Sequence, residues 1–254
     1  MNRRRFVIGN WKRYIESPRE AIAYARALRR RARSFAGVDA MIAPPFPLIP
    51  IVGAVLKGSS IHLGAQALSP WSDTKHTGDV SAALLVNSGV KFVIVGHSER
   101  RAVGESEEMV SAQMKLAIAA GLTPVLCVGE RERDQAGTYF AAISSQLSSA
   151  LAGLPKQAAL NLLIAYEPIW AIGKSAADAM KPQDLQEMVI FIRKTLADML
   201  ERSVAVRVPI LYGGSVEPEN ATALIEQSGI SGFLVGHASA DVDSFVEILK
   251  ACKK

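Results

Sequence analysis

Residues 162–173 read LLIAYEPIWAIG, and the order of residue types in this segment predicts the architecture of the whole chain. The segment opens with five apolar residues, and Glu167 and Pro168 end the apolar run at once. A strand with one wet face alternates polar and apolar side chains, whereas a strand covered on both faces does not. Residues 162–166 are therefore predicted to be a buried strand of a parallel sheet.

Seven further apolar runs of this kind occur at 6–9, 39–43, 61–65, 92–95, 123–128, 208–212 and 232–235. A helical pattern follows each run, and helix starts are readable near Ser17, Ser106, Pro182 and Pro218. No linker rich in Gly, Ser or Pro divides the chain, and a closed sheet leaves no unpaired edge. We therefore expect an α/β fold in which residues 1–254 form a single (β/α)8 barrel domain, with an open, doubly wound sheet as the alternative.

The composition excludes several classes of protein. The chain has 254 residues, of which 49% are apolar and 21% charged, as in ordinary globular proteins, so disorder and fibrous repeats are excluded. No apolar run approaches the roughly eighteen residues of a membrane span. The two cysteines, Cys127 and Cys252, provide no disulfide framework, which favours a cytoplasmic location without membrane partners.

The net charge of +5 makes nucleic acid or small anions conceivable partners. The densest basic segment contains Arg29, Arg30, Arg31 and Arg33. This segment closes a helical pattern, where cations complement the carbonyl end of the helix dipole. We therefore interpret the arginines as the end of a helix, and no nucleic-acid partner is predicted.

In a barrel of this kind the active site lies in the loops that follow the carboxyl ends of the strands. The candidate residues at those positions are Asn10, Lys12, Gln66, His97, Ser98, Glu99, Arg100, Glu130, Glu167, Gly213, Gly214, Ser215, Gly236 and His237.

Three of these candidates suit one kind of chemistry. The Glu167 carboxylate at the mouth of an apolar barrel becomes a stronger base when water is excluded, although taken alone it is equally consistent with a solvated loop residue. A neutral His97 donates a hydrogen bond to an oxygen that gains charge, although a purely structural histidine is the alternative. Lys12 supplies a positive charge. With glycine-rich loops to hold phosphate, this set predicts proton abstraction beside the carbonyl of a phosphorylated sugar.

The sequence resembles the triosephosphate isomerase family nearly from end to end. The matching segments, in that family's order, are GNWK at 9–12, GAQ at 64–66, GHSERR at 96–101, CVGE at 127–130, AYEPIWAIG at 165–173 and LYGGSV at 211–216. The resemblance implies a TIM barrel, a homodimer and no metal or organic cofactor. It also implies interconversion of dihydroxyacetone phosphate and D-glyceraldehyde 3-phosphate, in glycolysis and gluconeogenesis.

The resemblance also implies a role for individual residues. Glu167 corresponds to the base that moves a proton between two substrate carbons, and His97 to the neutral electrophile that polarises the carbonyl. Lys12 and Asn10 correspond to the residues that stabilise the enediolate, and Glu99 to the residue that holds Lys12. A glutamate base, a neutral histidine and a closing loop are well-known properties of this family, and the resemblance alone carries them to this chain.

Further residues match the family's phosphate site and lid. The family's lid begins at Pro168 and brings the backbone of Gly173 onto the phosphate, which the backbone at Ser215 and Gly236 also binds. Tyr212 corresponds to a residue that latches the closed lid. The segment around Thr77 matches the loop that inserts into the partner subunit, so that dimerisation would be needed for activity.

Three departures from the family pattern bear on substrate and rate. The far end of the lid has Lys174 to Asp178 where most members have Thr-Gly-Lys-Thr-Ala, which removes a hinge glycine. His237 replaces the second glycine of a pair, so that a side chain stands at or near the phosphate, facing either the ligand or solvent. One residue is missing between Arg101 and Gly104. These changes leave two alternatives: an isomerase of a four-carbon ketose phosphate, and a phosphate-binding barrel without turnover.

Overall fold

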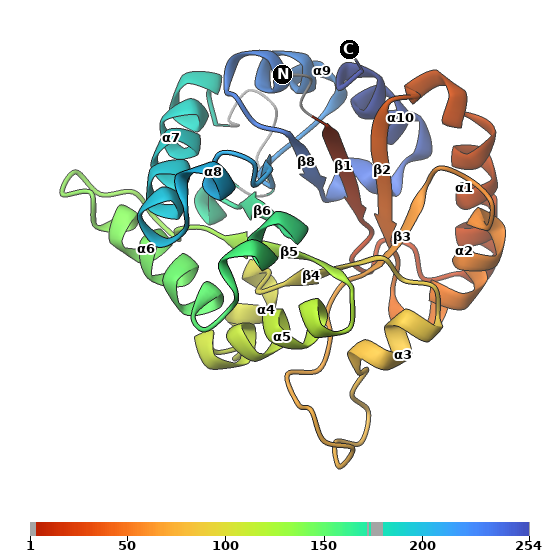
Figure 1. Ribbon diagram of the computed structural model, residues 1–254. Coiled ribbons are helices and arrows are strands. Elements are labelled where there is room, and N and C mark those ends of the chain that lie inside the picture. Colours follow the sequence, from red (N-terminus) through yellow and green to blue (C-terminus); the bar gives the residue numbers. More distant parts are fainter. Residues whose placement is uncertain (1–3, 172, 174–179, 254) are drawn as a thin grey trace.

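Eight parallel strands close into a barrel with helices around it (Figure 1) in the computed structural model, which describes residues 4–171, 173 and 180–253. Each strand pairs with the next, and β1 pairs with β8. The strands are β1 (Arg5–Asn10), β2 (Val38–Ala43), β3 (His62–Ala65), β4 (Phe92–Val95), β5 (Thr123–Val128), β6 (Leu163–Tyr166), β7 (Ile210–Tyr212) and β8 (Gly232–Val235). The predicted closed barrel is confirmed, and the open, doubly wound alternative is wrong.

Helices separate the strands, as the sequence pattern predicts. The α-helices are α1 (Pro18–Arg30), α2 (Ile49–Leu56), α3 (Ala82–Asn87), α4 (Ser98–Ala102), α5 (Glu107–Ala119), α6 (Thr138–Leu151), α7 (Pro182–Met199), α8 (Arg202–Ala205), α9 (Pro218–Gln227) and α10 (Val242–Ala251). Short 3₁₀ segments are η1 (Ala32–Phe35), η2 (Phe46–Leu48), η3 (Lys156–Asn161), η4 (Ile169–Ala171) and η6 (His237–Ala240). The four predicted helix starts are confirmed.

The two predicted serine caps differ in how they act. Ser106 accepts a hydrogen bond from the Met109 amide at 3.3 Å, which satisfies a free donor of the first turn of α5. Ser17 holds the N-cap position of α1 but makes no capping hydrogen bond through its side chain. The start of α1 therefore depends on Pro18, whose fixed φ suits the first helical position.

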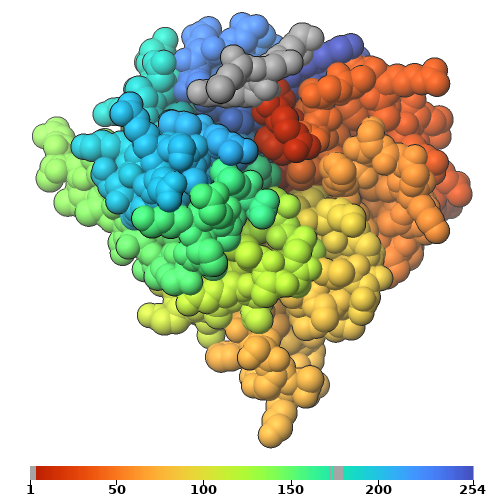
Figure 2. Space-filling view, in the orientation of Figure 1, coloured from red at the N-terminus to blue at the C-terminus, as the bar shows by residue number. Residues whose placement is uncertain are grey.

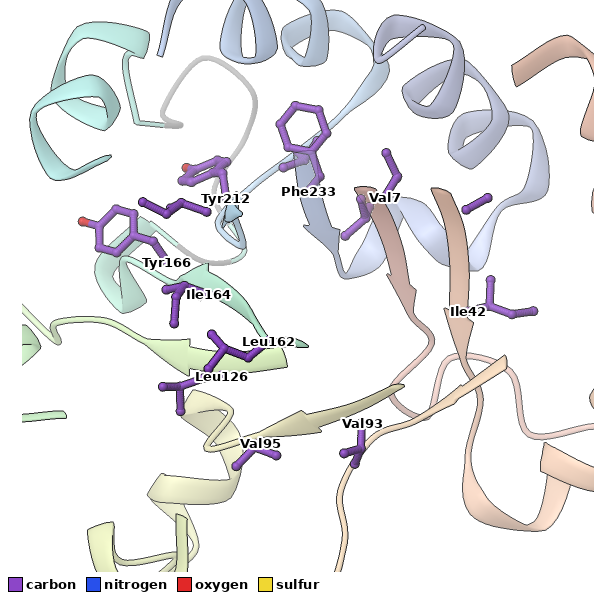
Figure 3. Packing of buried hydrophobic residues seen from close by; sticks show 14 of the residues in the cluster. Val7, Ile42, Val93, Val95, Leu126, Leu162, Ile164, Tyr166, Tyr212 and Phe233 are labelled. Carbon is purple, nitrogen blue, oxygen red and sulfur yellow. The ribbon is translucent and has the colours of Figure 1, made fainter. Parts of the chain in front are cut away.

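The apolar side chains of the strands form two layers because successive residues point to opposite faces. Phe6 and Ile8 belong to a cluster of twelve residues that fills the barrel. Val7, between them, belongs to the larger cluster between the strands and the helices. Figure 3 shows members of this outer layer, among them Val7, Ile42 and Phe233. Both faces of the sheet are thus buried, which explains the unbroken apolar runs.

Two surface features are relevant to partners. Arg29 and Arg30 form the last turn of α1, where the Arg29 guanidinium donates to the Val55 carbonyl, and Arg31 pairs with Asp243.

The loop between β3 and α3, residues 66–81, projects far from the barrel (Figures 1 and 2). Within the described part of the chain, no helix is long and apolar enough to cross a membrane.

Candidate active site

A cavity of about 330 Å³ lies at the carboxyl ends of the strands. The predicted site residues that line it are Asn10, Lys12, His97, Glu167, Gly173, Gly213, Gly214, Ser215, Gly236 and His237. Six predicted residues do not line it: Gln66, Ser98, Glu99, Arg100, Glu130 and Tyr212. Of these, Glu99 lies behind Lys12, and Tyr212 lies behind Gly214. The barrel therefore brings residues from five strand ends to one place.

Glu167 and His97 face each other across this cavity. Glu167 is 2% exposed and His97 is 6% exposed, so both groups are shielded from bulk water. One carboxylate oxygen, Glu167 Oε1, lies 3.2 Å from His97 Nε2. The other, Oε2, accepts a hydrogen bond from the Ser98 amide at 3.1 Å. The carboxylate thus lies against the N-cap residue and the first residue of α4, although it belongs to the loop after β6.

The contacts of His97 assign its tautomer. His97 is the N-cap residue of α4, and its Nδ1 accepts a hydrogen bond from the Glu99 amide at 3.2 Å. A ring nitrogen that accepts from an N–H carries no proton, so the remaining proton of a neutral imidazole lies on Nε2. That proton therefore lies on the ring nitrogen that is 3.2 Å from Glu167 Oε1. His97 is therefore arranged as a neutral hydrogen-bond donor.

Lys12 stands in a strained backbone conformation. Its φ is +45°, and it is the one residue other than glycine with positive φ among those that the structure describes. The neighbouring Trp11 is fully buried against the Tyr24 ring, and Gln66 donates to the Lys12 carbonyl at 2.9 Å. These contacts compensate for the strain, because a non-glycine residue persists there only when its surroundings fix it.

The strained turn aims the Lys12 ammonium into the site. Lys12 Nζ lies 2.6 Å from Glu99 Oε1, and the Lys12 amide donates to Asn10 Oδ1 at 3.1 Å. The Lys12 side chain is 19% exposed and that of Glu99 is 61% exposed. Since Glu99 is the more hydrated partner, it fixes the position of the ammonium without withdrawing it from the cavity.

Two glycines make room for Glu167. A Cβ at Gly129 would stand 1.8 Å from the Glu167 carbonyl oxygen, and a Cβ at Gly213 would stand 2.9 Å from Glu167 Cγ. Cys127 is buried beside the same carboxylate: burial and then the Glu167 charge raise the pKa of the thiol well above its ordinary value. The thiol therefore stays neutral, and it adds no competing anion beside Glu167.

Glu130 organises the start of the expected lid, a role that sequence reasoning missed. Its Oε1 accepts hydrogen bonds from the Tyr166 hydroxyl at 2.8 Å, the Trp170 indole at 2.8 Å and Arg133 Nε at 3.1 Å. Glu130 is 3% exposed. Burial and the Glu130 charge also raise the pKa of Tyr166. The sequence signal was an acidic residue at a strand end, but its donors come from other parts of the chain.

The opposite wall of the cavity consists of the loops after β7 and β8. The Ser215 hydroxyl donates to the Ala171 carbonyl at 3.0 Å, which joins this wall to the segment after Glu167. Asn220 donates to the Ser215 carbonyl at 3.2 Å and accepts from the Glu217 amide at 3.0 Å. Burial raises the pKa of Tyr212 to about 12, so its hydroxyl is protonated at neutral pH.

One predicted region is not among the described residues, and two residues that the sequence did not indicate line the cavity. The altered lid hinge, Lys174 to Asp178, lies outside the described residues. Tyr14 and Glu217 line the cavity although their positions in the sequence did not indicate it. Among residues 4–171, 173 and 180–253, no three His, Cys, Asp or Glu side chains are placed to bind one metal ion.

Comparisons with known proteins agree with this geometry. The family model described as triosephosphate isomerase matches residues 5–252. A protein named triosephosphate isomerase from Carboxydothermus hydrogenoformans is 44% identical over 250 residues, which is 98% of each chain. Proteins of the same name from Endomicrobium trichonymphae (41% identical, 99% of this chain and 100% of that one) and Symbiobacterium thermophilum (42%, 96% and 95%) are also similar. The chain belongs to the triosephosphate isomerase family.

Proposed function

We propose that this chain, as one catalytic barrel domain spanning residues 1–254, interconverts dihydroxyacetone phosphate and D-glyceraldehyde 3-phosphate through an enediolate. Family membership supports the substrates. The observation that carries the chemistry is the meeting of Glu167 Oε1 and His97 Nε2 at 3.2 Å in a shielded cavity that also holds Lys12. A base, a neutral hydrogen-bond donor and a cation are the groups that proton transfer beside a carbonyl needs.

Glu167 acts as the base in this proposal. Its carboxylate takes a proton from C1 of the ketose, the electron pair moves into the carbonyl, and the proton returns at C2 to give the aldose. In the structure the carboxylate also accepts from the Ser98 amide at 3.1 Å. Because a hydrogen-bonded carboxylate is a weaker base, substrate binding has to move Glu167 off this amide before the proton transfer.

His97 polarises the substrate carbonyl. With the proton on Nε2, the ring donates to the oxygen on which negative charge develops and then moves protons between the two substrate oxygens. Lys12 and Asn10 stabilise the same enediolate, and Glu99 positions Lys12 through the 2.6 Å contact. Preorganised donors in a site without bulk water stabilise a developing oxyanion more strongly than water does.

The phosphate group binds on the wall formed by Ser215, Gly236 and Gly173 in this proposal. All three residues line the cavity, and His237 lies at the same edge. Tyr212 holds the closed lid. Lid closure excludes water, which strengthens every electrostatic contact and protects the enediolate from loss of phosphate by elimination.

We also infer a homodimer, in which the loop around Thr77 packs into the partner subunit. Thr77 lies in the projecting loop, where Trp71 is 44% exposed and stacks on the His76 ring at 4.9 Å. Val103, in the segment that is one residue shorter than in the family, is 75% exposed. Sedimentation equilibrium tests this inference: Trp71→Ser should weaken a dimer, whereas a monomeric wild-type chain would refute it. A cytoplasmic location fits the two free cysteines.

The experiment that tests the proposed function is a coupled assay of kcat/KM on D-glyceraldehyde 3-phosphate, run beside a four-carbon ketose phosphate. The proposal expects a value toward the diffusion ceiling of about 10⁸ M⁻¹s⁻¹ for the triose phosphate. A value a thousandfold lower, with the four-carbon substrate preferred, would transfer the function to that substrate. No turnover of either sugar would refute the isomerase assignment.

A further inference from the structure

Three side chains from three different loops meet at the edge of the cavity beside the phosphate wall. Tyr14 follows β1, Glu217 immediately precedes α9, and His237 is the first residue of η6 after β8. All three line the cavity, together with Ser215 and Gly236. None of the three takes part in the proton transfers proposed above, so their meeting needs a separate explanation.

The contacts fix the imidazole of His237 opposite a carboxylate. His237 Nδ1 lies 4.0 Å from Glu217 Oε1. The His237 and Tyr14 rings pack edge to face, with centroids 5.6 Å apart and an interplanar angle of 89°. The His237 side chain is 81% exposed and that of Glu217 is 32% exposed. The imidazole can therefore exchange its proton with water, whereas the carboxylate is half-buried in the wall.

We propose that His237 and Glu217 form a pH-sensitive pair at the phosphate wall, in which protonated His237 cancels the charge of Glu217 and strengthens the binding of a dianionic phosphate group. The inference rests on the proposed function only for the chemical class of the ligand. Tyr14 holds the imidazole in position. His237 is thus a residue that sets substrate affinity, and it does not touch the reacting carbons.

The charges around the pair explain why His237 matters. A carboxylate on the wall that binds phosphate repels a dianion, and Glu219 adds negative charge near Glu217. Lys12 lies near Gly236, the neighbour of His237: its Nζ would be 3.9 Å from a Cβ placed at Gly236. The charge of this ammonium is already neutralised in part by Glu99. Burial raises the pKa of Glu217. At this edge, His237 is placed to compensate the carboxylate while its imidazole is protonated.

Affinity for a dianion should decrease as the imidazole loses its proton. Histidine side chains generally lose their proton between about pH 5 and 8. While the imidazole is protonated the pair is neutral, and once the imidazole is neutral an uncompensated Glu217 faces the ligand. Two unit charges about 5–6 Å apart in a water-like dielectric change an affinity by roughly threefold, so one unit charge opposite a dianion changes it by roughly tenfold. Affinity should therefore fall roughly tenfold as the pH rises, and added inert salt should reduce this effect.

Sulfate is the probe of choice because it stays a dianion across this range, whereas substrate phosphate itself titrates near pH 6. The dissociation constant of sulfate is measured by isothermal titration calorimetry at low ionic strength from about pH 5.5 to 8. The wild type should bind sulfate roughly tenfold more weakly at the alkaline end of this range than at the acidic end. His237→Gln should remove this component of the profile, and Glu217→Gln should restore tight binding at the alkaline end.

Glu219→Gln is the matched control. It removes the same charge two positions after Glu217, at a residue that is not among the described residues lining the cavity. It should keep the wild-type pH profile. Identical profiles for the wild type and His237→Gln would overturn the inference. Loss of the profile in Glu219→Gln would equally overturn it, because the effect would then be one of net charge. The assay of triose phosphate turnover tests the proposed reaction independently. Turnover together with a sulfate affinity that does not change with pH refutes only the His237–Glu217 pair. A sulfate affinity that changes with pH as expected, without turnover, refutes only the proposed reaction.

Discussion

Replacement of Lys12 by alanine removes the positive charge of the site, and the structure allows the effect to be estimated. The ammonium lies 2.6 Å from Glu99 and its side chain is 19% exposed, so an effective dielectric constant of about 20 is appropriate. A substrate oxyanion about 4 Å away then interacts with the ammonium by about 4 kcal/mol. Since each 1.4 kcal/mol corresponds to about tenfold, kcat/KM should fall by about a thousandfold.

The same position offers an internal control on stability. With φ at +45°, a residue with a Cβ is strained, and glycine relieves that strain. Lys12→Gly and Lys12→Ala should therefore lose activity equally, whereas the unfolding free energy of the glycine variant should be about 1 kcal/mol higher. The coupled assay and urea denaturation measure the two quantities. A loss of activity below about tenfold, or an alanine variant as stable as the glycine variant, would show that the charge or the strain has been misjudged.

Three further predictions concern the supports of the site. Tyr166→Phe removes a buried hydroxyl that donates to Glu130 and accepts from Arg133, so thermal unfolding should show a loss of about 2 kcal/mol, while Tyr14→Phe at an exposed ring should show almost none. Gly129→Ala places a Cβ 1.8 Å from the Glu167 carbonyl oxygen, so kcat/KM should fall at least about a hundredfold or the chain should fail to fold; wild-type activity would contradict this geometry. Asp241→Ala removes the N-cap of α10 and should cost about 1 kcal/mol at pH 7. The Ser244 amide lowers the pKa of Asp241 in the folded protein. The stabilisation is therefore present above the unfolded-state pKa of about 3.9 and is lost as the pH falls through the lower folded-state pKa. Unfolding free energies of wild type and variant that still differ at about pH 2, measured by urea titration, would contradict this.

The barrel was predictable from sequence because buried parallel strands leave a local signal. Runs at 92–95, 123–128 and 232–235 match the observed strands at both ends. The run at 208–212 was predicted two residues too long. Pro209 has no amide proton to donate to a neighbouring strand, and β7 begins after it at Ile210. Local composition therefore predicts which segments form strands better than where each strand starts.

Most residues that line the site could be predicted from the sequence, but the contacts between them could not. Closure of the barrel brings strand ends together, which is why Lys12, His97 and Glu167 line one cavity. The strained φ of Lys12 depends on Trp11 and Gln66, and the donors to Glu130 come from separate segments. Tyr14 and Glu217, which the sequence did not indicate, also line the cavity. Most of these contacts join residues far apart in the chain, such as Gln66 with Lys12 and Trp170 with Glu130, and no periodicity or spacing encodes them.

Proton transfer by Glu167 is the step on which the proposed reaction depends most directly. Substrate is incubated in D2O with the wild type, Glu167→Asp or Glu167→Gln, and deuterium at the substrate carbons is followed by NMR beside the rate of isomerisation. We expect rapid exchange in the wild type, a loss of about a hundredfold or more in the aspartate variant, whose carboxylate is drawn back by about 1 Å, and a larger loss in the glutamine variant. Sulfate should still bind to all three proteins. Exchange and turnover in Glu167→Gln within about tenfold of the wild type would contradict the assignment of Glu167 as the base.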